Sequence, residues 1–221
     1  MSLYEFLEKG GLLMIPLVFM SVVSISIFLE RMWALRRSVI APLGLGQAVR
    51  TLIRGKKFDE AEALCEQSGT ALARIAMVGI RHRGRHRAII KESMEERGNA
   101  EVSHMERRTG AIATVATIAP LLGLLGTVTG MITVFQDISA VADPEMSTLA
   151  GGIWEALITT AAGLTVAIPA FALHRFLISR VDRLSLEMAD ESLKILETLD
   201  EILSSTRPAT VPNAHHVEVE S

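Results

Sequence analysis

Glu155 is the residue whose type and setting point most directly to chemistry. It lies in GGIWEALITTAAGL, inside a run from Met146 to Leu173 that holds no other Asp, Glu, Lys or Arg. An acid within membrane hydrocarbon costs about 3 kcal/mol on insertion scales, so such acids usually face a bundle interior or a watery cavity and are functional by default. No apolar run of this chain supplies a Lys, Arg or His to neutralise Glu155. Its counter-group is therefore a proton, an ion or a group from another chain, and a carboxyl in that setting can exchange protons near neutrality.

The neighbours of Glu155 on its own helix leave two interpretations open. Helical spacing places mainly small or hydroxyl-bearing residues on the face of Glu155, namely Thr148, Gly152, Thr159, Ala162, Gly163 and Val166. Small residues and hydroxyls around an acid are typical of a polar crevice rather than of a lipid surface. The structural alternative is that Glu155 holds helices together through a hydrogen bond to a backbone or Thr partner.

Three apolar blocks are long enough to cross a membrane. They are Gly10 to Leu29, Thr109 to Gln136 and Met146 to Leu173. A span needs roughly 20 mainly apolar residues to cross a core of about 30 Å, and in lipid only a helix satisfies its own backbone at that length. A signal peptide is disfavoured for the first block, because MSLYEFLEKG holds two Glu against one Lys and no small-x-small cleavage site follows.

The distribution of basic residues predicts the orientation of these spans. The stretch 30–108 holds 16 of the 22 Lys and Arg, whereas the connection between the second and third blocks has none. Basic segments stay on the cytoplasmic side, so the N-terminus is expected outside and the C-terminus inside, in a bacterial inner membrane. The expected order is a periplasmic N-terminus (1–10), a first span (11–29), a cytoplasmic helical domain (30–108), a second span (109–136), a periplasmic turn (137–147), a third span (148–173), a cytoplasmic helix (174–204) and a disordered tail (205–221).

Helical periodicity dominates the cytoplasmic segments, and no strand pattern competes with it. A helix pair is expected over 44–67, broken where Arg54-Gly55 interrupts the pattern, and another helix is expected to begin at SGTA with Ser68 or Thr70 as its cap. The run 88–108 should lead directly into the second span, and the run 179–203 should continue the third. The predicted fold is an all-α integral membrane protein with three transmembrane helices, of which spans two and three extend into a cytoplasmic helical bundle.

Small residues in the spans predict close helix packing. Pro120, Gly123 and Thr127 share one face of the second span, and Gly126 with Gly130 forms a GxxxG spacing on a neighbouring face. In the third span, Gly152 and Gly163 are likewise expected to allow close contact between helices. Tight packing between membrane helices explains these faces without any further function.

No other motif supports a second chemistry. His82 and His86 have a metal-compatible i,i+4 spacing in RHRGRHR, but the four Arg of this segment disfavour a cation, and a basic patch near anionic lipid headgroups is the better interpretation. Cys65 is the one cysteine, which excludes a disulfide framework within the chain. There is no P-loop, Gly-x-Ser-x-Gly or HExxH. We therefore predict no enzyme activity, no metal, no nucleic-acid partner and no cofactor other than protons as the coupling ion.

Two segments resemble the MotA/TolQ/ExbB proton-channel family. They are ERRTGAIATVATIAPLLGLLGTVTGMITVF and GGIWEALITTAAGLTVAIPA, with a looser similarity through GKKFDEAEALCE. Three spans with an outer N-terminus are similar to the ExbB/TolQ branch, because the flagellar MotA subunits have four. The resemblance implies a homopentamer around a dimer of a single-span ExbD/TolR-like protein, whose membrane Asp carries the proton, and a TonB/TolA-like protein as a further partner.

The resemblance also implies which residues line the proton path. By residue-by-residue comparison, Thr127 in GLLGTVTG and Glu155 and Thr160 in WEALITTAAGL match the pore-lining positions of the family. Thr160 lies about 140° from Glu155 on an ideal helix, whereas Thr159 would share its face, so Thr159 stays as the second choice. The implied function is the proton-channel or stator subunit of a motor that drives TonB-dependent import, Tol-Pal maintenance or another envelope task. The alternative is a non-conducting membrane scaffold in which Glu155 is structural.

Overall fold

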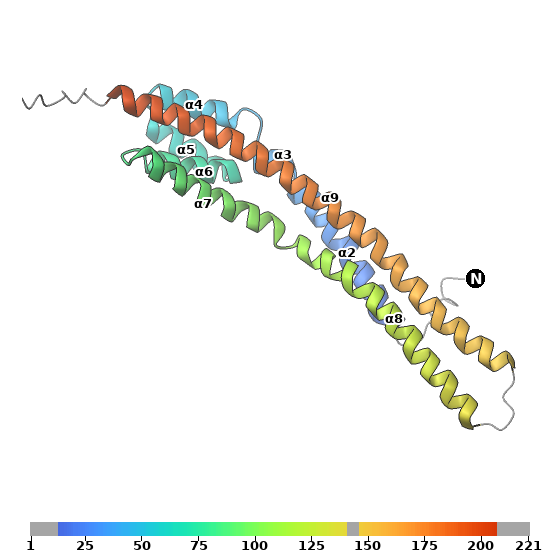
Figure 1. The fold of residues 1–221 in the computed structure, drawn as a ribbon. Helices are drawn as coiled ribbons and strands as arrows, with labels where there is room; N and C mark the ends of the chain where they lie inside the picture. Colours follow the sequence, from blue (N-terminus) through green and yellow to red (C-terminus); the bar gives the residue numbers. More distant parts are fainter. Residues whose placement is uncertain (1–12, 141–145, 207–221) are drawn as a thin grey trace, which may run out of the picture. The chain divides into compact units, whose positions relative to one another are not determined.

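The protein is described by a computed structural model over residues 13–140 and 146–206, apart from the side chains of Arg37, Val39, Ala140, residues 146–149, Glu155 and Thr206. Within these residues every regular element is a helix, which confirms the predicted all-α class (Figure 1). The helices are α2 (Met14–Ala34), α3 (Arg37–Ile40), α4 (Leu45–Arg54), α5 (Phe58–Ser68), α6 (Ala71–Arg81), α7 (Arg87–Glu106), α8 (Thr109–Ala140) and α9 (Met146–Thr206).

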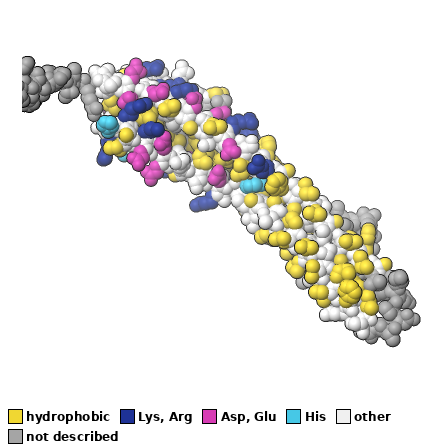
Figure 2. Space-filling model, viewed as in Figure 1, with side chains coloured by type: hydrophobic (Ala, Val, Ile, Leu, Met, Phe, Trp, Pro, Cys, Tyr) yellow, Lys and Arg dark blue, Asp and Glu magenta, His cyan; other side chains and the backbone are white. Residues whose placement is uncertain are grey.

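Three of these helices are long and apolar enough to cross a membrane. The qualifying segments are Met14–Ala34, Thr109–Ser139 and Ala150–Ser205. Hydrophobic side chains cover the visible surface of these spans, whereas charged side chains gather over α4 to α7 and the last part of α9 (Figure 2). Large exposed side chains such as Phe19, Leu121 and Phe171 are 59–69% exposed. Such a surface is suited to lipid or to neighbouring subunits rather than to water.

The chain divides into two compact units. The first unit comprises Met1–Val39 and Ala100–Ser185, and the second comprises Ile40–Asn99 and Leu186–Ser221. The helices α7 and α9 each contribute residues to both units. The first unit therefore contains α2, α8 and the larger part of α9, and the second contains the small helices α4 to α6.

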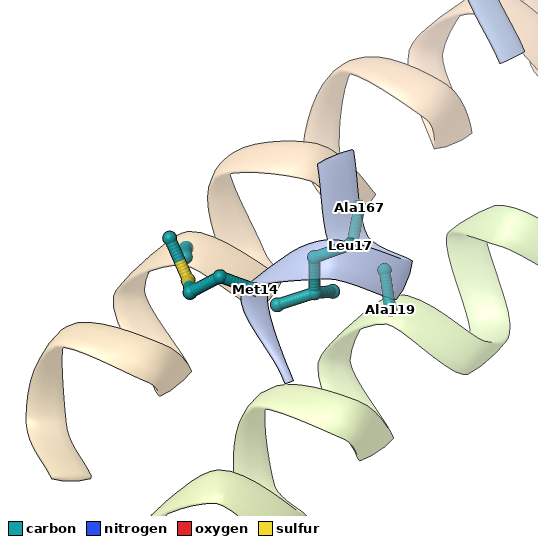
Figure 3. Packing of buried hydrophobic residues seen from close by; sticks show 5 residues of the cluster. Met14, Leu17, Ala119 and Ala167 are labelled. Carbon is teal, nitrogen blue, oxygen red and sulfur yellow. The ribbon is translucent and has the colours of Figure 1, made fainter. Parts of the chain in front are cut away.

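In the first unit, α2 packs against both α8 and α9. Met14 and Leu17 of α2 are buried in one cluster with Ala119 of α8 and with Ala162 and Ala167 of α9 (Figure 3). Large side chains on α2 meet alanines on the other two helices, so the three backbones come close enough for dispersion contacts without a cavity.

Further contacts bind the other end of α2 to the same helices. Arg108, which precedes α8, pairs with Glu30, and the Arg180 guanidinium of α9 donates to the Leu35 carbonyl over 2.9 Å. The hydrogen bond from Arg180 satisfies a backbone carbonyl just past the C-terminus of α2.

In the second unit, local sequence signals define the helix ends. The break expected at Arg54-Gly55 separates α4 from α5, and Lys56 in this turn has a positive φ of 56°. Of the two expected caps, Thr70 is the N-cap of α6, because its side chain accepts a hydrogen bond from the Ala73 N–H. Such a cap typically contributes about 1 kcal/mol to stability.

The junction between α7 and α8 differs from the prediction that one helix would lead directly into the second span. Helix α7 ends at Glu106, and α8 begins at Thr109. The Thr109 hydroxyl donates to the Glu106 carbonyl over 2.6 Å, and Arg108 turns toward Glu30 of α2. A side-chain donor for a terminal carbonyl and a tertiary ion pair both favour ending α7 here.

The connection between α8 and α9 starts later than expected. Helix α8 continues to Ala140, beyond the predicted end of the span at 136, and α9 begins at Met146. The predicted N-terminal segment, most of the expected tail and the middle of this turn lie outside the described residues. Which side of the membrane each segment occupies stays a prediction.

Glu191 connects α4 and α9 in the second unit and gives stability a pH dependence. Its carboxylate accepts from Arg50 over 2.6 Å and from Lys194 over 3.1 Å. Partial burial alone would raise the pKa of Glu191, but the hydrogen bonds from Arg50 and Lys194 outweigh it, so this pKa lies below its usual value. A depressed carboxyl pKa contributes stability above the unfolded pKa and loses it as the pH falls through the folded pKa.

We expect Glu191→Gln to lower the free energy of unfolding at pH 7 by roughly 1–2 kcal/mol. The difference from the wild type should shrink as the pH falls below about 4.5, because the unfolded carboxyl is then protonated while the folded one is still ionised, and it should be lost once the pH has passed the lowered folded pKa. Thermal unfolding of the full chain in detergent at pH 7 and pH 3.5 measures this. Glu95→Gln is the control, because the Lys91–Glu95 pair is more than half exposed and should contribute little. An equal effect of both variants would contradict the assignment.

Candidate functional site

The helices α8 and α9 meet along a seam of small residues. An added Cβ on Gly163 would lie 2.6 Å from the Ala119 carbonyl oxygen and 3.0 Å from the Gly123 Cα, so no side chain fits there. Further along the seam, a Cβ on Gly130 would meet Ala156 at 2.9 Å. As residue numbers rise on α8 they fall on α9, so the two helices run antiparallel and close together.

Two further glycines of this seam accommodate side chains of the opposite helix. An added Cβ on Gly126 would lie 2.2 Å from the Thr159 methyl carbon, and one on Gly152 would lie 2.0 Å from a Val134 methyl carbon. The glycines that the sequence predicted as packing positions therefore lie at contacts between α8 and α9 of one chain.

Thr160 links the two helices through a hydrogen bond. Its hydroxyl donates to the Gly123 carbonyl of α8 over 2.8 Å. Thr159, the second choice for the path, is 3% exposed and packs on Gly126. Both threonines therefore reach α8, although they lie about 100° apart on α9. Their part in lining a path stays a prediction.

Thr127 and Pro120 lie on α8 beside these contacts and are half-buried. The Thr127 hydroxyl donates to the Leu124 carbonyl of its own helix over 2.7 Å. Pro120 has no N–H, so the Ala116 carbonyl loses its helical donor. Thr127 is four residues beyond Gly123, which places it one helical turn from the hydrogen bond of Thr160.

Glu155 lies within α9, one turn before Thr159, and its side chain is outside the described residues. The next residue, Ala156, is 2% exposed and contacts Gly130. The backbone at position 155 is therefore part of the α9 segment that packs on α8. It lies between Thr160 and the turn that connects α8 to α9.

A histidine that the sequence analysis did not single out, His174, lies at the other end of the seam. The His174 Nδ1 is 3.2 Å from the Thr109 carbonyl, and Thr109 is 1% exposed. One signal could have identified it: His174 is the first residue after the apolar block and lies fourteen positions beyond Thr160, which brings it to a similar side of the helix.

The two histidines of the second unit, His82 and His86, have different surroundings. The His82 Nδ1 lies 2.8 Å from the Val78 carbonyl of its own helix. His86 lines a cavity of about 510 Å³ with Arg83, Arg85, Arg87 and Asp200. Among the described residues, no three His, Cys, Asp or Glu side chains form a group that could hold a metal ion.

The sequence of the chain matches known proteins along most of its length. The MotA/TolQ/ExbB proton channel family model matches residues 67–190. An ExbB-like biopolymer transport protein of Synechocystis sp. is 36% identical over 181 residues, which are 79% of this chain and 70% of that protein. An ExbB homologue of Methanothermobacter thermautotrophicus is 30% identical over 82% of this chain and 64% of its own length.

A relative from the Tol-Pal system matches a shorter part of this chain. The Tol-Pal system protein TolQ of Haemophilus influenzae is 41% identical over 98 residues, which are 43% of each chain. The family match includes α8, the described part of α9 up to residue 190, and therefore all the seam contacts above. The chain thus belongs to the MotA/TolQ/ExbB proton channel family, a family of multi-pass membrane transport proteins and not of enzymes.

Proposed function

We propose that this chain is the proton-channel subunit of an inner-membrane motor that couples the proton motive force to mechanical work on the cell envelope. The observation that carries the proposal is the α8–α9 seam, where the Thr160 hydroxyl bridges to the Gly123 carbonyl within two helices otherwise suited to lipid. Glu155, the one acid of the third apolar block, lies on the same helix. One charge crossing 100 mV yields about 2.3 kcal/mol, enough to bias a step between two packed helix arrangements.

Members of this family generally work with ExbD or TolR and with TonB or TolA. We propose the corresponding assembly for this chain: a homopentamer around a dimer of a single-span ExbD/TolR-like protein, whose membrane Asp carries the proton past Thr127, Glu155 and Thr160. The lipid-suited outer surfaces of α2, α8 and α9 would then contact lipid or neighbouring subunits. The concentration of Lys and Arg in 30–108 supports a periplasmic N-terminus and a cytoplasmic C-terminus.

The competing function is a non-conducting scaffold. The seam glycines support a scaffold equally well, because they bring α8 and α9 together whether or not ions pass. The Thr160 hydroxyl could also serve only to connect the helices. A scaffold would use Glu155 only to form hydrogen bonds between helices, which a neutral polar side chain could do without the cost of a charge in lipid. Import, Tol-Pal maintenance and other envelope tasks are all compatible with the channel proposal.

The test is proton flux into liposomes that contain this chain together with its single-span partner, driven by a potassium diffusion potential and followed with an internal pH dye. We expect flux only when both proteins are present. Thr160→Val should lower it, while Thr160→Ser, which keeps the donor to Gly123, should largely retain it. Native mass spectrometry of each sample verifies assembly. A fully assembled wild-type complex that passes no protons would favour the scaffold.

A further inference from the structure

His174 is held in one orientation by α8. Its Nδ1 lies 3.2 Å from the Thr109 carbonyl, the ring is half-buried, and Thr109 is 1% exposed. A carbonyl oxygen only accepts hydrogen bonds, so the contact assigns the hydrogen to Nδ1. The neutral ring then has its lone pair on Nε2, and Nε2 is the atom that can gain and lose a proton.

The position of His174 along the seam is the second observation. On α9, the eighteen residues from 156 to 173 contain no titratable side chain, and α8 contains none from 109 to 136. His174 is therefore the first titratable group of the α8–α9 pair that a proton meets beyond Glu155 on its way toward the Thr109 end.

Two of the hydrogen bonds between α8 and α9 have the same helix register. Thr160 donates to Gly123, and His174 contacts Thr109. The two contacts are therefore fourteen residues apart along α9 and fourteen residues apart along α8. Fourteen residues correspond to about 21 Å of helix and to nearly four turns. His174 thus lies on a similar side of α9 to Thr160, at the far end of the same contact with α8.

We propose that His174 receives the proton at this end of the path and passes it to water, an inference that rests on the proposed channel function. In the first step the Nε2 lone pair binds the incoming proton and the ring becomes an imidazolium. In the second step the same Nε2–H bond breaks and the proton leaves to a water molecule. The Nδ1–H stays bonded to the Thr109 carbonyl throughout, so the ring keeps its orientation in both states.

Among the charged groups near this end, arginines predominate and the acid of α2 is paired. Arg175 follows His174 on α9, and Glu106, Arg107 and Arg108 precede Thr109. On α2, Glu30 is engaged by both Arg31 and Arg108, and Phe28 packs near Phe176 of α9. The acid of α2 is therefore already paired with two arginines, so water rather than Glu30 is the acceptor for a proton that leaves Nε2.

The deciding variant is His174→Asn, measured in the reconstituted complex with the single-span partner. An Asn side chain can still donate an N–H to the Thr109 carbonyl but cannot titrate. We expect the flux to fall about tenfold or more, and millimolar imidazole on the inner side to restore a substantial part of it. His104→Asn is the matched control, because His104 is exposed on α7, and it should conduct normally.

Each outcome bears on the proposal. Wild-type flux in His174→Asn, or lost flux in an intact complex that imidazole does not restore, would overturn the proposal and leave a structural contact.

Histidine-labelled NMR of the wild-type complex provides a second test that needs no variant. Nε2 of His174 should titrate while Nδ1 stays protonated, and a ring that does not titrate between pH 5 and 9 would also overturn the proposal. Absence of flux in the wild type would count against the channel function itself, so the two failures are distinguishable.

Discussion

Proton flux through the reconstituted complex should fall by about a hundredfold or more when Glu155 is replaced by Gln, while the complex stays assembled. Gln keeps the size and part of the hydrogen bonding of Glu but cannot exchange a proton, and a positioned acid or base typically contributes at least this factor to a proton transfer. The third apolar block contains no other titratable side chain that could substitute for it. The flux assay in liposomes measures the loss directly.

Glu155→Ala separates a proton role from a packing role. Ala removes the side chain as well as its titration, so both variants should stop conduction if protons pass by way of the carboxyl. If Glu155 only holds helices together, Gln should conduct like the wild type, and Ala should lower the yield of the assembled complex instead. Normal flux in an intact Glu155→Gln complex would remove this residue from the mechanism.

The helices could be predicted from sequence because their signals are local. Apolar length is sufficient to identify the three candidate spans, Arg54-Gly55 is sufficient to end α4, and Thr70 is a recognisable cap. The end of α7 at Glu106 was not predictable in this way. It depends on the Thr109 hydroxyl and on Arg108 reaching Glu30, and the second of these partners is distant in sequence.

The contacts of the candidate site depend on the register between two helices, which periodicity along one helix does not specify. An ideal helix places Thr159 on the face of Glu155 and Thr160 elsewhere, which made the two threonines look like alternatives. In the structure Thr159 packs on Gly126 while Thr160 donates to Gly123, so both contact α8. The spacing of His174 from Thr160 could have placed it on a similar side of α9, but its contact with Thr109 depends on the antiparallel register.

The seam also bears on how self-association should be read from sequence. The GxxxG pair Gly126 and Gly130 suggested close contact between membrane helices, and in the structure these glycines contact α9 of the same chain. Contacts between subunits of the proposed assembly would then involve other surfaces, such as the exposed apolar faces of α2, α8 and α9. Substitutions at the seam glycines should consequently act first on the fold of each subunit and only through it on assembly.

Gly163→Ala should therefore destabilise the subunit by about 1–3 kcal/mol, the usual cost of overpacking a tight contact. The added methyl group would lie 2.6 Å from the Ala119 carbonyl and 3.0 Å from the Gly123 Cα, and backbone atoms cannot rotate away as a flexible side chain can. The helices α8 and α9 must move apart, which also lengthens the hydrogen bond from Thr160 to Gly123. Thermal unfolding in detergent measures the stability, and native mass spectrometry measures the yield of the oligomer. Gly151→Ala is the matched control on the same helix, because a Cβ there meets nothing within 4 Å, and it should be at least as stable as the wild type since Ala favours a helix over Gly. Equal stability of the two variants would show that α8 and α9 can separate without cost, and the close seam would then not be what holds the proposed path together.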